Sequence, residues 1–172
     1  MYIENEKHYI QDIIGLIFDT DFISSPKNPA ELFDGKIHKN TEGEIVGWVI
    51  NSKEIKFWDE GMLDVDEYAE RNNQNKITEL SSFSYHFQPD NETLKSYRID
   101  KDYDDIHANS SRFSELDDHL SPAELKLKIT KFNLIISIYI AMKYIKNEDK
   151  YPLLDENANF YNKIIDGKEG EY

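Results

Sequence analysis

The stretch FSYHFQ, residues Phe83–Gln88, alternates aromatic and polar side chains without interruption. Successive side chains of a β-strand point to opposite faces, so this alternation predicts a strand with one aromatic face and one polar face. A turn signal follows at residues 89–91, and Leu94–Asp100 alternates again. The two stretches therefore predict an antiparallel pair, in which Tyr85 and Tyr97 share the face that meets the core.

This register decides which polar side chains lie together. With Tyr85 and Tyr97 on the core face, His86, Arg98 and Asp100 all lie on the opposite face. A slip of one residue would move the whole set to the other side, so burial of the aromatic face fixes the arrangement.

Three more strands are expected before this pair. Residues 44–50 are rich in β-branched and aromatic side chains, residues 53–58 alternate, and Asn51-Ser52 between them reads as a tight turn. Residues 62–68 form the third strand, in which Glu67 falls on the apolar face with Leu63 and Val65.

Two helices complete the predicted fold. Residues 4–20 repeat apolar side chains with helical spacing, through Ile10, Ile13, Ile14, Ile17 and Phe18. The stretch Ser121-Pro122-Ala123-Glu124 has the composition of a capping box, and it predicts a long helix that runs to about Lys146.

The expected architecture is therefore α+β. It consists of a mostly antiparallel β-sheet of about five strands, with an N-terminal helix and a long C-terminal helix packed on one face. Residues 1–166 are expected to form a single globular domain, and residues 167–172 a C-terminal tail.

Composition narrows the class of protein. The 172 residues include 34 acidic and 20 basic side chains, a formal net charge of −14, and no cysteine. The absence of cysteine excludes a disulfide scaffold, a thiolate metal site and a cysteine nucleophile. The N-terminal residues contain no apolar signal region, and the longest apolar run, residues 132–145, is too short to cross a bilayer. We therefore expect a cytoplasmic protein that does not bind membranes.

The charge is unevenly distributed along the chain. Residues 59–105 contain thirteen acidic and five basic side chains, whereas residues 121–146 carry five lysines and one glutamate. Because nucleic acid phosphates are repelled by a strongly acidic surface, nucleic acid binding is unlikely except at a local cationic site.

Common catalytic signatures are missing, including the P-loop, the dinucleotide-binding glycine motif, the zincin motif and the nucleophile elbow. The remaining candidate is a cluster of histidine, arginine and aspartate. Histidine suits general acid–base chemistry and arginine binds phosphate, so such a set is typical of an RNA-cleaving site. The candidate catalytic residues are His86, Arg98, Asp100, His107 and His119.

Two other interpretations use overlapping residues. His107 and His119 with a nearby aspartate would suit zinc or iron, but their spacing is not diagnostic, and we predict no metal site and no cofactor. Carboxylates and tyrosines could instead form a face that binds a basic protein. The candidate partner-binding residues are Asp102, Tyr103, Asp104, Asp105, Asp117 and Asp118.

Five stretches between residues 43 and 120 also form an ordered pattern. They are Gly43–Trp48, Phe57–Tyr68, Phe83–Gln88, Tyr97–Asp100 and a segment that ends at His119-Leu120. In this order they resemble the TumE-like toxin family of prokaryotic toxin–antitoxin modules. The resemblance implies a toxin, with RNA as the candidate substrate, that is neutralised by an antitoxin.

The sequence thus leaves two hypotheses open. The first is a TumE-like toxin that acts through the histidine, arginine and aspartate site. The second is a non-enzymatic acidic binding protein, such as an immunity protein, a phage-encoded inhibitor or a nucleic-acid mimic, that occupies a basic surface. Both imply a protein partner, either an antitoxin or a basic target, and neither specifies the oligomeric state.

Overall fold

The computed structural model describes residues 2–18, 23–24, 36–58, 61–72, 77–90, 92–102, 105–110 and 120–168. It is built around a seven-stranded antiparallel sheet. The strands are β1 (Tyr2–Ile3), β2 (Lys36–Lys39), β3 (Ile45–Phe57), β4 (Gly61–Arg71), β5 (Thr78–Pro89), β6 (Tyr97–Asp102) and β7 (Asp105–Asn109). Strands β2 to β7 follow one another in chain order across the sheet, and β1 pairs with β5.

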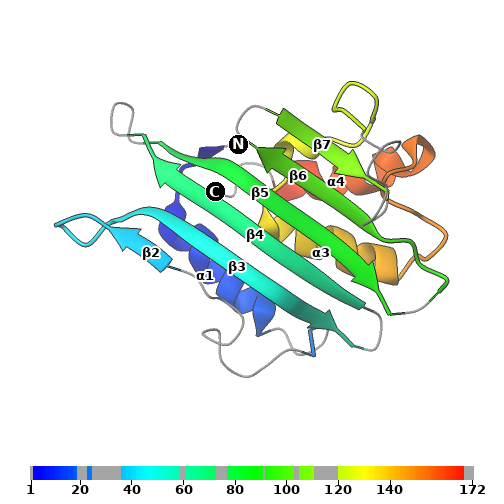
Figure 1. The fold of residues 1–172 in the computed structure, drawn as a ribbon, viewed down its shortest axis with the longest axis horizontal. Helices are drawn as coiled ribbons and strands as arrows, with labels where there is room; N and C mark the ends of the chain where they lie inside the picture. Colours follow the sequence, from blue (N-terminus) through cyan, green and yellow to red (C-terminus); the bar gives the residue numbers. More distant parts are fainter. Residues whose placement is uncertain are drawn as a thin grey trace.

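Three α-helices of the described residues cover one face of this sheet. They are α1 (Glu6–Ile17), α3 (Leu134–Ile145) and α4 (Ala158–Lys168), and single 3₁₀ turns lie at Ile129–Lys131 and Asp155–Asn157. All three helices lie behind the sheet in Figure 1, and in the described part of the chain no helix covers the front face. The α+β class and the one-sided packing are as predicted, but the sheet has more strands than the expected five.

The additional strands are short, and their sequences show little of the alternation that predicts a strand. The four residues of β2 are all exposed, so no buried face leaves an alternating pattern in the sequence. Strand β7 lies in a polar, acidic region for which no strand was predicted, and it is held by its pairing with β6. Strand β1 has only two residues.

The predicted turn at Asn51-Ser52 is wrong, because β3 continues through it. Asn51 pairs with Asp66 and Ser52 with Val65, and the register shifts between Ser52 and Ile55. Such an irregularity absorbs extra residues without ending the strand. One strand of thirteen residues therefore replaces the two short strands expected.

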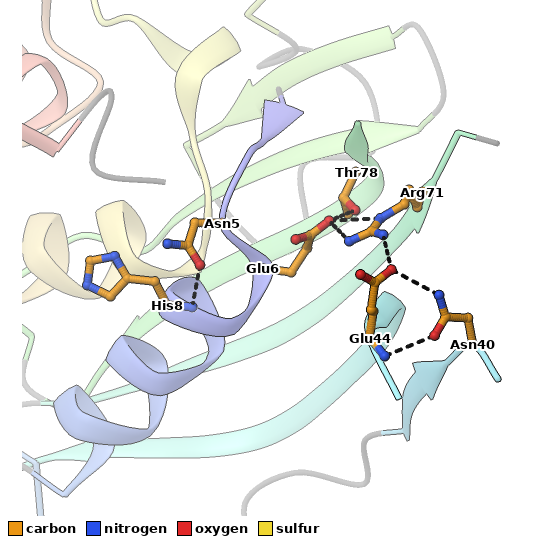
Figure 2. Close-up of polar contacts among 7 residues, drawn as sticks. All are labelled: Asn5, Glu6, His8, Asn40, Glu44, Arg71 and Thr78. Carbon is orange, nitrogen blue, oxygen red and sulfur yellow. Dashed lines mark hydrogen bonds and ion pairs between the residues drawn. The ribbon is translucent and has the colours of Figure 1, made fainter. Parts of the chain in front are cut away.

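Helix α1 is shorter than the predicted helix over residues 4–20. It begins after Asn5, whose side-chain oxygen accepts a hydrogen bond from the His8 backbone N–H at 3.1 Å (Figure 2). Tyr9, Ile10, Ile13 and Ile17 are buried against the core. The predicted apolar stripe was too wide, because Ile14 and Phe18 are exposed.

The long helix predicted from Ser121 is also wrong in its first half, because α3 begins only after Asn133. The Glu124 side chain does accept the Ser121 backbone N–H at 2.8 Å, but the motif closes a single turn. Leu125, Leu127 and Ile129 are then buried in alternation, with the period of an extended chain.

Side chains from later in the sequence accept hydrogen bonds from the backbone of this extended segment. The Lys126 N–H donates to Asp155 at 3.1 Å, and the Lys128 N–H donates to Asn162 at 3.0 Å. Asn133 then caps α3, because its side-chain oxygen accepts the Ile136 N–H at 2.8 Å. The predicted tail, residues 167–172, begins inside α4, which ends at Lys168, and residues 169–172 lie outside the described part.

The core lies between the helices and the rear face of the sheet. Its largest fully buried side chains include Trp48, Tyr85, Phe87, Tyr97 and Tyr144. None of the helices in the described residues is long and apolar enough to traverse a bilayer.

Candidate functional site

The predicted register of β5 and β6 is confirmed. His86 lies directly opposite Arg98, and Ser84 directly opposite Asp100, while Tyr85 opposite Ile99 faces the core. Four of the five candidate catalytic residues therefore lie on the sheet face that no described helix covers, which we call the open face. The fourth is His107, which lies opposite Asp100 across β6 and β7.

Asp100 is the centre of this group. Its side chain is 9% exposed, and its Oδ1 accepts a hydrogen bond from Arg98 Nε at 2.8 Å. Its Oδ2 lies 3.5 Å from His107 Nε2. Arg98 Nε also donates to Ser84 Oγ at 3.2 Å. Arg98 Nε is thus already engaged by a carboxylate and a hydroxyl of the same protein.

The two described histidines of the group differ in their surroundings. His86 is 6% exposed and lies on β5 between Asp64 of β4 and Arg98 of β6. His107 lies 3.5 Å from Asp105 through Nδ1, in addition to its contact with Asp100. Both imidazoles therefore have carboxylates as neighbours. His119, the fifth candidate, lies outside the described residues.

A hollow in the open face adjoins this group. Its volume is about 440 Å³, and its lining includes Asp66, Tyr68, Ser82, Ser84 and Asp102, together with the cationic Arg98 and Lys101. Arg98 is paired with Asp100, and Lys101 Nζ lies 3.4 Å from Glu79. Ser82 and Ser84 lie on the central strand β5, between β4 and β6. Because serine is short, the flanking side chains rise above the floor that β5 provides.

Charge on the open face is predominantly negative. Alternation and cross-strand pairing place seven carboxylates on it, from Asp64, Asp66, Glu70, Glu79, Asp100, Asp102 and Asp105. Among the described residues of β4–β7 that share this face, Arg98 supplies the only permanent positive charge. Lys36 and Lys56 lie on the same face further out, on β2 and β3.

The predicted partner-binding residues are only partly described. Asp102 and Asp105 lie directly opposite each other on β6 and β7. The Asp105 side chain is 78% exposed. The remaining members of the predicted set, Tyr103, Asp104, Asp117 and Asp118, lie outside the described residues.

A second polar cluster lies at the far end of β4 and has a structural role (Figure 2). Glu6 of α1 accepts Arg71 Nη2 at 2.7 Å and the Thr78 hydroxyl at 2.6 Å. Arg71 also reaches Glu44 at 3.3 Å, and Glu44 accepts the Asn40 amide at 3.0 Å. These polar groups are hydrogen-bonded to one another, and the cluster connects the start of α1 to strands β4 and β5.

Glu67 is a buried carboxylate on the core face, as its position in the alternation predicted. It is 2% exposed and accepts hydrogen bonds from the Tyr85 hydroxyl, from Trp48 Nε1 at 2.7 Å and from the Tyr9 hydroxyl at 2.9 Å. The Leu134 N–H at the start of α3 also lies 3.2 Å from it. Burial raises the pKa of Glu67 above its usual range, and the four donors oppose that rise.

Asp66, Tyr68, Ser82 and Ser84 were not predicted to be site residues. Their signal was present, because the same alternation that placed Glu67 inward places Asp66 and Tyr68 outward. What the sequence did not show was that β4 and β5 bring them together around one hollow.

Within the described residues, no group of three or more histidine, aspartate or glutamate side chains is arranged to hold a metal ion.

No family model, curated protein or solved structure matches the chain. The resemblance to TumE-like toxins therefore stays a hypothesis.

Proposed function

We propose that this protein is a non-enzymatic binding protein whose open face docks against a basic surface of a partner protein. The observation that carries this proposal is the excess of carboxylates on a sheet face that no described helix covers. A surface of this kind attracts a cationic partner over a long range and speeds its association. We also propose that it acts in the cytoplasm, in keeping with its lack of cysteine.

The engagement of Arg98 supports binding over RNA cleavage. A phosphate bound to Arg98 would lie beside Asp100, whose Oδ1 is 2.8 Å from Arg98 Nε, and the two anions would repel each other. It would also have to approach a face rich in carboxylates, and phosphate and carboxylate repel each other. These charges instead favour a target that is itself basic, such as a toxin or a nucleic-acid-binding protein.

Capture of a partner from the native host tests this proposal. The bait proteins are the wild type, an open-face variant with Asp64→Asn, Asp66→Asn and Asp102→Asn, and a control with Asp149→Asn, Glu156→Gln and Asp166→Asn. The control removes the same number of charges from the region of α3 and α4. We expect a stoichiometric basic partner with the wild type and the control, but not with the open-face variant. Equal capture by all three baits would contradict the proposal.

An RNA-acting toxin is the second candidate, and one observation favours it. His86, Arg98, Asp100 and His107 lie on a single face, as an acid, a base and a cationic stabiliser would require. Induced expression of the wild type beside a His107→Ala/His119→Ala variant separates the two functions. Growth arrest that the double substitution relieves would support the toxin, and absence of arrest would contradict it.

A further inference from the structure

We infer that the hollow in the open face accepts a guanidinium group, supplied by an arginine side chain of the partner. This inference rests on the proposed function and adds the chemistry of recognition to it. It identifies Asp66 and Asp102 as the carboxylates that bind the cation and Tyr68 as the wall beside it.

The carboxylates that line the hollow differ in their partners. Asp100 is paired with Arg98 and contacted by His107. In the part of the chain that the structure describes, no lysine, arginine or histidine lies within ion-pair distance of Asp66 or Asp102, and both residues are exposed. Asp66 does receive a neutral donor, because the Asn51 amide can be oriented to donate to its Oδ1 at 3.0 Å.

Two carboxylates beside the hollow form an unfavourable pair inside the sheet. Asp102 and Asp105 are directly opposite each other on β6 and β7. Like charges at such positions destabilise a sheet. A cation bound beside Asp102 would reduce this repulsion. The reduction in repulsion would contribute to the binding free energy.

The shape of the hollow suits a planar cation. Ser82 and Ser84 leave open space above β5, in a volume of about 440 Å³. Tyr68 lines one side of it, and its hydroxyl donates to Glu70 at 2.7 Å, which fixes the ring orientation. A planar guanidinium can stack on an aromatic ring while its N–H groups point to carboxylates, whereas an ammonium group offers a compact point charge. The combination of ring and carboxylates therefore favours arginine over lysine.

Titration of the full-length protein with two peptides of equal charge tests this assignment. The probes are hexa-arginine and hexa-lysine, and binding is followed by NMR chemical shifts at about 150 mM salt, which screens diffuse attraction. We expect hexa-arginine to bind at least about fivefold more tightly than hexa-lysine, with the largest shifts at Tyr68, Ser82, Ser84 and Asp102. The Asp66→Asn/Asp102→Asn variant is expected to lose at least about fivefold in affinity for hexa-arginine.

A matched control variant distinguishes binding in the hollow from nonspecific attraction by the net charge of the protein. Asp149→Asn/Glu156→Gln removes two exposed carboxylates between α3 and α4 and is expected to bind hexa-arginine like the wild type. The Asp66→Asn/Asp102→Asn variant must also stay folded, and its free energy of unfolding is expected to be equal or higher because the Asp102–Asp105 repulsion is removed. A loss of affinity without a loss of stability is a result that a merely structural role would not produce.

Three results would overturn the assignment. Equal binding of the two peptides would remove the preference for guanidinium. Equal weakening by both double variants would show that net charge alone attracts the peptide, and absence of measurable binding would show that the hollow does not take a cationic side chain. In each case, capture of a basic partner that still depends on the open face would leave the proposed function standing. Loss of that capture as well would refute both.

Discussion

Arg98 Nε lies 2.8 Å from Asp100 Oδ1, and the two residues occupy the same face of strand β6, two positions apart. This contact changes the interpretation of the histidine, arginine and aspartate group. An arginine held by a poorly exposed carboxylate stabilises the sheet, because its charge offsets that of the carboxylate. The contact therefore gives Arg98 a role in the fold through Nε.

Removal of Arg98 is expected to destabilise the protein. In Arg98→Met, Asp100 loses its ion-pair partner in a site where its side chain is 9% exposed, and we expect a loss of about 1–2 kcal/mol in the free energy of unfolding. Urea denaturation at pH 7 measures it. The control is Lys126→Met, whose partner Asp155 is at the surface, with an expected loss below about 1 kcal/mol. Equal effects of the two substitutions would contradict the assignment.

The beginning of α3 gives a second prediction. Asn133 is fully buried and caps the helix, so Asn133→Ala should cost about 1–2 kcal/mol. Ser121 begins a single turn instead of a helix, so Ser121→Ala should cost less than about 0.5 kcal/mol. Thermal unfolding of both variants checks the contrast, and a larger loss for Ser121→Ala would favour the longer helix.

Glu67 gives a prediction for the pH dependence of stability. Its pKa is raised in the folded state, so the folded protein binds the proton more tightly than the unfolded chain. The resulting contribution to stability is present below the unfolded pKa of about 4.5 and is lost as the pH rises through the folded pKa. Relative to Glu67→Gln, the wild type should therefore become less stable as the pH rises above 4.5. Urea denaturation between pH 4 and 8 gives this difference, and a constant difference would contradict it.

Glu6 predicts the opposite pH dependence of stability, because its pKa is lowered in the folded state. Burial alone would raise its pKa, but hydrogen bonds from Thr78, from its own backbone N–H and from Arg71, with the charge of Arg71, lower it. A lowered pKa contributes stability above the unfolded value, and this contribution is lost as the pH falls through the folded pKa. The wild type should exceed Glu6→Gln in stability at pH 7, and the difference should shrink below pH 4.5. A difference that grows toward low pH would refute this role.

The sequence was sufficient to predict the face on which the site lies. Side-chain parity in paired strands depends only on burial of one face, and the aromatic alternation around Tyr85 made that face clear. The same reasoning placed Glu67 inward. It could not reveal the pairing of Arg98 with Asp100, because several other carboxylates of this acidic chain were equally plausible partners.

The extended segment before α3 shows where sequence reasoning fails. Leu125 and Ile129 fit a helical stripe, while Leu125, Leu127 and Ile129 fit an alternating strand, so the apolar pattern is ambiguous. Asp155 and Asn162 favour the extended form, because their side chains accept hydrogen bonds from the backbone of this segment. They lie about thirty residues further along the chain. A local pattern carries no information about such distant partners.

The account depends most on one claim, that a basic partner contacts the open face. Zero-length carbodiimide cross-linking of the captured complex, followed by peptide mass spectrometry, tests it directly, because it joins lysines of the partner to carboxylates that they touch. The account predicts cross-links to Asp64, Asp66, Asp102 or Asp105 that high salt weakens. Cross-links confined to Asp149, Glu156 and Asp166, near α3 and α4, would contradict it.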